Sequence, residues 1–193
     1  MKDRLFRLIS IESAEESRVT MLLWQSVFLG IFYGTFDVSA HSIFLSFFDE
    51  KMLARAYVVS GFTGIILSFI YLRYHTRFSF RNFAVANLLL ITAVTIILWI
   101  LLLLYPVGWV IFLVFIMLGP LNILAMLGFR GNLNRMFTHR YGKNLSGLIE
   151  GGTIFGIIMS CFAIPVLLSL GLKLHNILLI GAAAALAGTV IQI

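Results

Sequence analysis

An acidic side chain and an imidazole interrupt one of the most apolar stretches of the sequence. Asp37 and His41 lie within residues 30–48, GIFYGTFDVSAHSIFLSFF, where the other residues are apolar, small or hydroxyl-bearing. A spacing of four residues places both side chains on one face of a helix. A charge within a bilayer costs about 3 kcal/mol or more, so such a group normally faces a bundle interior or a polar path. The pair predicts a site for a proton, a cation or a substrate, with a hydrogen-bonded packing role as the alternative.

A second group of charges lies where the chain leaves one apolar run and enters the next. Residues 129–152, FRGNLNRMFTHRYGKNLSGLIEGG, contain Arg130, Arg140, Lys143 and Glu150. Arg130 and Glu150 are candidates for an ion pair between consecutive helices, which could hold one conformation closed. We therefore expect these four residues to form a cytoplasmic gate. The alternative is an ordinary basic loop beside a helix that packs through glycine.

Two amides and several glycines complete the set of candidate site residues. Gln25 belongs to the same apolar run as Asp37, and Asn122 follows Pro120 in a later run, so both could border the path of a substrate or ion. Glycines spaced four residues apart let two helix backbones approach closely. This spacing predicts helix packing at Gly30, Gly34, Gly147, Gly151, Gly152 and Gly156.

The composition requires that membrane-spanning helices hold these residues. Of 193 residues, 61% are hydrophobic and 11% are charged, whereas soluble domains have about 45–50% apolar and about 25% charged residues. Apolar runs long enough to cross a bilayer recur along the chain, and they are continuous, unlike the alternating strands of a β-barrel. The sequence therefore predicts an all-α polytopic membrane protein in contact with the lipid bilayer.

Six spans are predicted, after a cytoplasmic amphipathic helix over residues 1–18 that lies on the membrane surface. The spans cover residues 19–48, 53–72, 83–104, 108–129, 145–170 and 174–193 of a transmembrane domain over residues 19–193. The first is long for one crossing, so we expect it to tilt, to break near Gly30 to Gly34, or to protrude. No basic flank follows the last span. We therefore expect a fragment or half of a larger transporter, working with a second six-helix half from the same chain, a second copy or another subunit.

The basic residues predict the orientation of these spans. The side of the N-terminus carries Lys2, Arg4, Arg7, Arg18, Arg73, Arg77, Arg81, Arg130, Arg135, Arg140 and Lys143, whereas the other side carries Lys51, Arg55 and Lys173. Loops rich in Lys and Arg stay in the cytoplasm. We therefore expect a cytoplasmic N-terminus, in a bacterial inner membrane. The same bias accounts for the net charge of +6 without a nucleic-acid partner.

Patterns typical of enzymes and metal sites are missing from the sequence. It contains no GxSxG, no HExxH, no phosphate-binding P-loop and no cysteine pair. Cys161, the single cysteine, is expected to be a buried packing residue. We therefore predict that the protein is not an enzyme and uses neither a metal nor another cofactor.

The layout resembles one half of a major-facilitator-type transporter. The match rests on six helices that start from the cytoplasm, the basic link 73–77 (RYHTR) and the stretch 140–143 (RYGK) before the fifth span. More narrowly, residues 5–48, LFRLISIESAEESRVTMLLWQSVFLGIFYGTFDVSAHSIFLSFF, and 134–158, NRMFTHRYGKNLSGLIEGGTIFGII, look like the N-terminal half of ATP/ADP-translocase-like carriers. The resemblance implies alternating access and, in that family, antiport of nucleotides.

Two functions from different classes follow as hypotheses. The first is secondary transport of a small molecule or ion, nucleotide or organic ion among them, about a midplane site lined by the first, second, fourth and fifth spans. The third and sixth spans carry almost no polar groups and are expected to face lipid. The second hypothesis is a non-transporting scaffold or sensor, whose basic loops dock a cytoplasmic partner or lipid.

Overall fold

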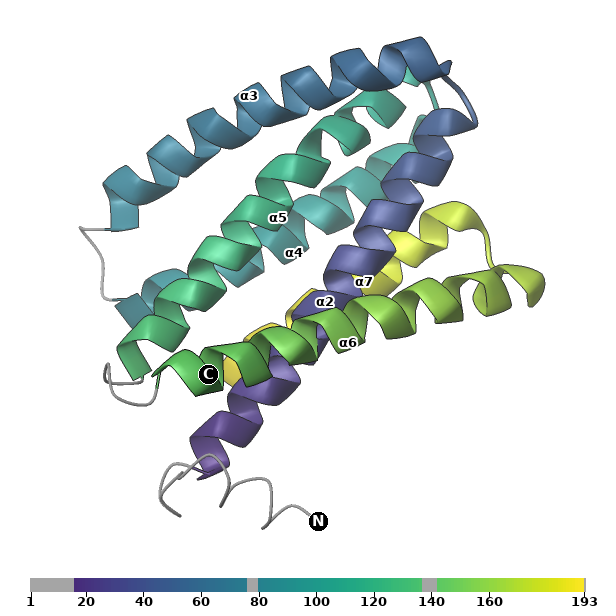
Figure 1. The fold of residues 1–193 in the computed structure, drawn as a ribbon. Coiled ribbons are helices and arrows are strands. Elements are labelled where there is room, and N and C mark those ends of the chain that lie inside the picture. The colour runs from purple at the N-terminus through teal and green to yellow at the C-terminus, as the bar shows by residue number, and fades with distance from the viewer. Residues whose placement is uncertain (1–15, 76–79, 137–141, 193) are drawn as a thin grey trace.

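The computed structural model describes residues 16–75, 80–136 and 142–192, and in these ranges the chain forms long helices joined by short connections (Figure 1). Six helices are long and apolar enough to cross a membrane, and the described ranges contain no strand, so the predicted all-α, six-helix membrane fold is confirmed. The helices are α2 (Glu16–Leu45), α3 (Glu50–His75), α4 (Phe80–Leu104), α5 (Gly108–Met136), α6 (Gly142–Ser169) and α7 (Leu174–Gln192).

The helix bounds agree with the predicted spans to within about three residues, except at one end of α5. This helix continues to Met136, past the end of its membrane-spanning part at Gly131. The first span does not break near Gly30 to Gly34, because α2 is one continuous helix of 30 residues. The surface helix predicted over residues 1–18 lies mostly outside the described residues.

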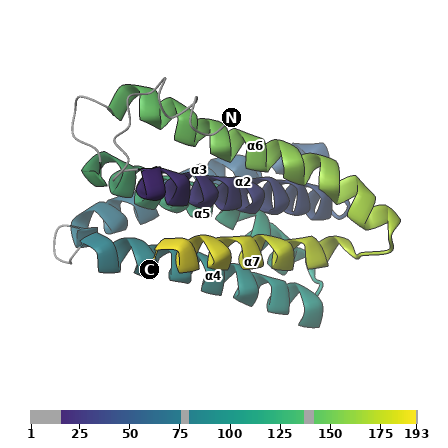
Figure 2. The ribbon, with the colours of Figure 1, turned by 90° about the horizontal axis from the view of Figure 1, so that it is seen from below.

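The long central helix α2 organises the bundle. It packs against α6 on one side and α7 on the other, and it also contacts α5. Behind it in Figure 1, α4 packs against both α7 and α5, while α3 lies along α5. The view from below in Figure 2 places α6 and the pair α4 and α7 on opposite sides of α2. As a result, α3 and α6 form the two flanks of the bundle, with α2 and α5 between them.

Aromatic rings pack at the contact between α2 and α5. Phe44 of α2 and Phe115 of α5 are both fully buried, and the ring of Phe44 also meets that of Phe112. The ring centroids of Phe44 and Phe115 lie 4.5 Å apart. Because lipid tails are as apolar as these side chains, close packing holds membrane helices together more than water exclusion does. This cluster therefore fixes the two helices that stand in the middle of the bundle.

Glycine brings α2 and α6 into backbone contact. A Cβ atom on Gly30 would lie 2.1 Å from the carbonyl oxygen of Thr153, and one on Gly156 would lie 2.2 Å from that of Val27. A Cβ on Gly34 or Gly152 would instead meet a serine hydroxyl, a side-chain atom that can move. At Gly30 and Gly156 the obstacle is backbone, so only a residue without a Cβ fits there. The structure therefore places all four glycines at the α2–α6 contact, with backbone against backbone at Gly30 and Gly156.

Gly147 and Gly151 make no such contact within this six-helix unit. A Cβ on either residue would meet nothing within 4 Å, and both glycines are exposed. The physical reason is helical geometry, because Gly151 and Gly152 point about 100° apart around the helix axis. The face that contacts α2 contains Gly152, so Gly151 and Gly147 must turn away from it.

A serine of α3 replaces the backbone hydrogen bond that α5 loses at its proline. Pro120 has no N–H, so the carbonyl oxygen of Ile116 loses its helical partner. The hydroxyl of Ser60 donates to this oxygen at 2.8 Å, and its own oxygen accepts from the N–H of Gly119 at 3.2 Å. In a membrane an unpaired backbone group is costly, so this contact both keeps α5 continuous and joins α3 to it.

Exposure of side chains differs from the sequence prediction. The third and sixth spans, α4 and α7, pack against each other, whereas α3 and α6 are the least buried helices. Phe69 of α3 is 75% exposed and Phe162 of α6 is 74% exposed. In these six helices, therefore, the flanks α3 and α6 offer the largest apolar surface to lipid or to another chain.

Candidate functional site

A groove of about 400 Å³ opens on the bundle where α2, α5 and α6 meet. Its wall is mostly apolar, and the side chains that could bind a polar group come from α2 and α5. The lining residues are Tyr33, Gly34, Asp37, Val38, Asn122, Ile123, Met126, Ile157 and Cys161. A concave, largely apolar wall with a few polar groups is the usual form of a small-molecule site.

Asp37 is the charged residue of this wall. Its side chain is 51% exposed, and it lines the groove. A rise of 1.5 Å per residue places it about 12 Å from Leu45, where α2 ends, and about 27 Å from Val19, where the membrane-spanning part of α2 begins. The acid therefore lies well inside the span, at a depth where its charge needs water or protein around it.

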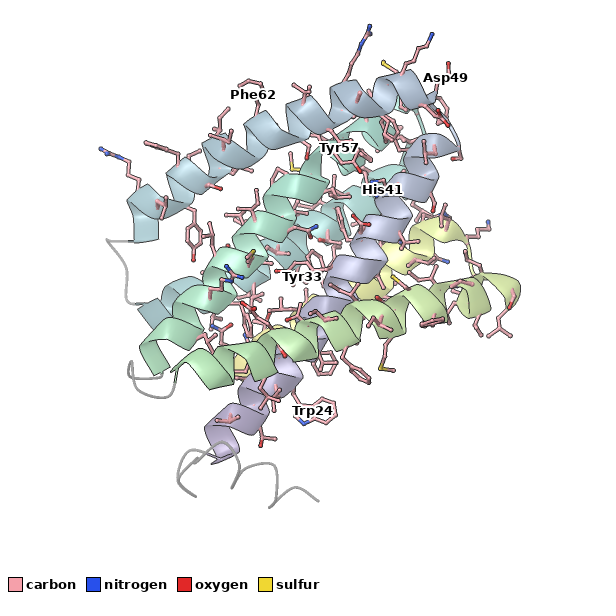
Figure 3. The ribbon with its side chains drawn as sticks, in the orientation of Figure 1. Trp24, Tyr33, His41, Asp49, Tyr57 and Phe62 are labelled. Carbon is pink, nitrogen blue, oxygen red and sulfur yellow. The ribbon has the colours of Figure 1, made fainter. Side chains whose placement is uncertain are left out.

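His41 connects Asp37 to the flanking helix α3. The Nδ1 atom lies 2.8 Å from the backbone oxygen of Asp37 and 3.5 Å from its carboxylate Oδ1, while Nε2 is hydrogen-bonded to the hydroxyl of Tyr57. Figure 3 shows His41 and Tyr57 between α2 and α3. Both rings also meet the edge or face of Phe115, each with a centroid distance of 5.1 Å. Since α2 and α3 otherwise barely touch, this contact joins them.

Tyr33 and Asn122 line the groove one helical turn from Asp37 in the direction of the N-terminus of α2. The Tyr33 hydroxyl donates a long hydrogen bond of 3.5 Å to the backbone oxygen of Asn122. The side-chain oxygen Oδ1 of Asn122 is buried without a donor among the described residues. The sequence prediction placed Asn122 on the pathway, and the structure places it in the groove wall.

An ion pair stands between α5 and α6, as the sequence predicted. The Nη2 atom of Arg130 lies 2.9 Å from Oε1 of Glu150, and each side chain is about half exposed. Arg130 follows Met126 of the groove wall by one turn, and Glu150 precedes Ile157 of the wall by two turns. The pair therefore spans the gap between the two helices at the side where α2 begins.

The contacts of the other two residues of the predicted gate are not described. Arg140 lies outside the described residues, as does the side chain of Lys143 at the start of α6. The candidate gate therefore rests on Arg130 and Glu150.

Gln25 does not belong to the groove. It is 2% exposed, and its Nε2 donates to Oε1 of Gln192 at 2.9 Å, which ties α2 to the end of α7. Gln25 and Asp37 are twelve residues apart, which corresponds to about 120° around the helix. Gln25, predicted to border the pathway, is therefore absent from the wall of this groove, and its contact with Gln192 is a packing contact.

The sequence prediction missed Tyr33 in the groove wall and Tyr57, the partner of His41, and it misplaced Cys161. Tyr33 could have been found, because it precedes Asp37 by four residues and so shares its face. Tyr57 gives no such signal, since its partner comes from another helix. Cys161 was expected to be buried, but it is exposed and lines the groove. No group of three His, Cys, Asp or Glu side chains that could hold a metal ion occurs among the described residues.

Comparisons with known proteins find no relative of the chain. No protein-family model matches it, and neither a curated protein nor a solved structure does.

Proposed function

We propose that the chain is one half of a secondary transporter that works by alternating access, and that the groove is its share of the substrate path. The observation that carries the proposal is the position of Asp37, which stands half exposed in a groove well inside a membrane span. A charge at such a depth is stable only beside water or protein. A water-filled path closed by a second six-helix half, with Asp37 in its wall, meets that requirement.

The arrangement of the helices supports this reading. The groove lies on the side of the bundle away from α4, and the flanks α3 and α6 leave their apolar faces uncovered. Discontinuous or polar-faced helices near the midplane are typical of carrier sites between two halves. The resemblance to one half of a major-facilitator-type transporter, and to ATP/ADP-translocase-like carriers more narrowly, agrees with such a path.

Arg130 and Glu150 serve in this proposal as a gate on the cytoplasmic side. Their ion pair joins α5 and α6, which otherwise barely touch, so its loss would let the two helix ends separate. Switching between discrete arrangements of packed helices is a common route for such movements. The distribution of basic residues supports a cytoplasmic position for this side, and the proposal places the protein in a bacterial inner membrane.

Labelling of single cysteines tests whether the groove is a water-filled path. In a Cys161→Ser background, Val38→Cys places a thiol in the groove wall. The matched control is Ile97→Cys, on α4, where Ile97 is 54% exposed and does not line the groove. Val38 lies seven residues before the end of α2, and Ile97 lies seven residues before the end of α4. Both helices end on the same side of the membrane, so the two thiols lie at a similar depth.

The labelling reagent is a membrane-impermeant maleimide, which reacts only with a thiol that water can reach and ionise. We expect the maleimide to label Val38→Cys and to leave Ile97→Cys unmodified in intact membranes. If neither thiol reacts until detergent is added, the groove is not a water path. The non-transporting scaffold or sensor would then be the better account of the chain.

A further inference from the structure

We infer that the groove binds an organic cation with an apolar body, whose positive group is held by the carboxylate of Asp37. This inference rests on the transporter function proposed above and names the class of its substrate. It depends on three observations: an acid without a lysine or arginine partner, a neighbouring imidazole whose hydrogen bonds go to neutral oxygens, and apolar groove walls of sufficient size.

Within the described part of the chain, no lysine or arginine neutralises Asp37. The ion contact of its carboxylate is with the ring of His41, at 3.5 Å. The nearest arginine along the groove wall is Arg130, one turn beyond Met126, and its guanidinium is engaged by Glu150 at 2.9 Å. A carboxylate in this position, half exposed to the groove, attracts a cation more strongly than it would in bulk water.

The hydrogen bonds of His41 go to neutral oxygens. Its Nδ1 lies 2.8 Å from the backbone oxygen of Asp37, and a carbonyl oxygen can only accept, so Nδ1 carries a proton. Nε2 is hydrogen-bonded to the hydroxyl of Tyr57. The carboxylate Oδ1 of Asp37 lies farther from the ring, 3.5 Å from Nδ1. The carboxylate therefore has no close hydrogen bond from this ring and remains available to a ligand.

The rest of the wall suits an apolar body. Val38, Ile123, Met126 and Ile157 line the groove together with the ring of Tyr33. The volume of about 400 Å³ lies within the range of small-molecule sites, about 300–1,000 Å³. An aromatic face and a methionine sulfur both interact favourably with organic cations and their rings. The wall has no basic side chain for phosphate groups, so the geometry disfavours the nucleotide that the resemblance implies.

Cys161 provides a test without any added cysteine. It is the single cysteine of the chain and lines the same groove as Asp37. Two thiosulfonate reagents of similar size are compared in intact membranes, one carrying a trimethylammonium group and the other a sulfonate. Each rate is divided by the rate of that reagent with a free thiol in solution, so that the ratio reports the charge of the groove.

In the wild-type protein, the corrected labelling rate of Cys161 should be about fivefold or more higher for the cationic reagent than for the anionic one. The reason is that the interaction with one nearby unit charge contributes about 1 kcal/mol. Asp37→Asn should bring the ratio close to one, and Asp37→Glu should keep the preference. The matched control Asp49→Asn removes an exposed acid in the connection after α2, which does not line the groove and lies away from Tyr33 in Figure 3. It should leave the ratio unchanged. Ethidium should slow the labelling of the wild type, whereas ATP at the same concentration should not.

The labelling experiment distinguishes failure of the cation inference from failure of the transporter proposal. Equal labelling by both reagents, a preference for the anionic one, or protection by ATP and not by ethidium would overturn the cation inference and leave a water-filled groove. Failure of both reagents to reach Cys161 in intact membranes would overturn the transporter proposal as well. If Asp37→Asn does not fold, loss of the preference in Asp37→Glu would count against Asp37 as the cation site.

Discussion

The guanidinium of Arg130 lies 2.9 Å from the carboxylate of Glu150 and joins α5 to α6, two helices that have little other contact. Because both side chains are about half exposed, the pair contributes only about 0.2–1 kcal/mol to stability. Its position between two helix ends makes it better suited to bias a conformation than to hold the fold. We therefore propose that the pair acts as a switch, a role that mutation can separate from folding.

Glu150→Gln and Arg130→Gln should each leave thermal stability nearly unchanged. Both should raise, by up to about fivefold, the rate at which an uncharged impermeant reagent labels Cys161 from the side that carries the ion pair. The charge swap Arg130→Glu with Glu150→Arg should restore the slow rate, since it rebuilds the contact. Glu50→Gln, at the start of α3 on the opposite side, is the control. Identical rates in all variants would show that the pair is not a gate.

Gly156→Ala should destabilise the bundle, whereas Gly151→Ala should not. A Cβ on Gly156 would lie 2.2 Å from the carbonyl oxygen of Val27, while one on Gly151 meets nothing within 4 Å. Overpacking of this kind costs about 1–3 kcal/mol, and alanine at an open helix position gains up to about 1 kcal/mol over glycine. Unfolding of the purified variants in detergent, followed by circular dichroism, measures the difference. Equal stability of the two would contradict the described α2–α6 contact.

The spans and one ion pair could be predicted from sequence because they depend on local pattern. Long apolar runs set the helices, since each must cross the bilayer with its backbone bonds satisfied internally. Arg130 and Glu150 could be paired because they stand at facing ends of consecutive antiparallel helices. Both inferences need only the order of residues along the chain.

The faces of the helices were harder to predict, because they depend on which helices become neighbours. Gly151 and Gly152 offer two glycine faces about 100° apart, and only packing against α2 selects the second. Gln25 was assigned to the path, although it lies about 120° from Asp37 and bonds to α7. Tyr57 and His41 meet across two helices, which no spacing along one helix reveals.

Ser60→Ala should cost about 0.5–1.5 kcal/mol, because it leaves the carbonyl oxygen of Ile116 without a donor. In a Pro120→Ala background the cost should shrink, since the new N–H at residue 120 can bond that oxygen within the helix. Ser68→Ala is the control, as the hydroxyl of Ser68 donates to Gly64 of its own helix at 2.7 Å. Additive costs in the double-mutant cycle would show that Ser60 does not compensate for Pro120.

Transport by the purified protein in liposomes tests the central claim most directly. Uptake of ethidium down an imposed gradient is compared for the wild type, Asp37→Asn and the control Asp49→Asn. The account predicts saturable uptake by the wild type and by Asp49→Asn, and a loss of at least about tenfold in Asp37→Asn, because the carboxylate offsets the cost of bringing a cation into the membrane. Equal uptake by Asp37→Asn and the wild type would contradict it.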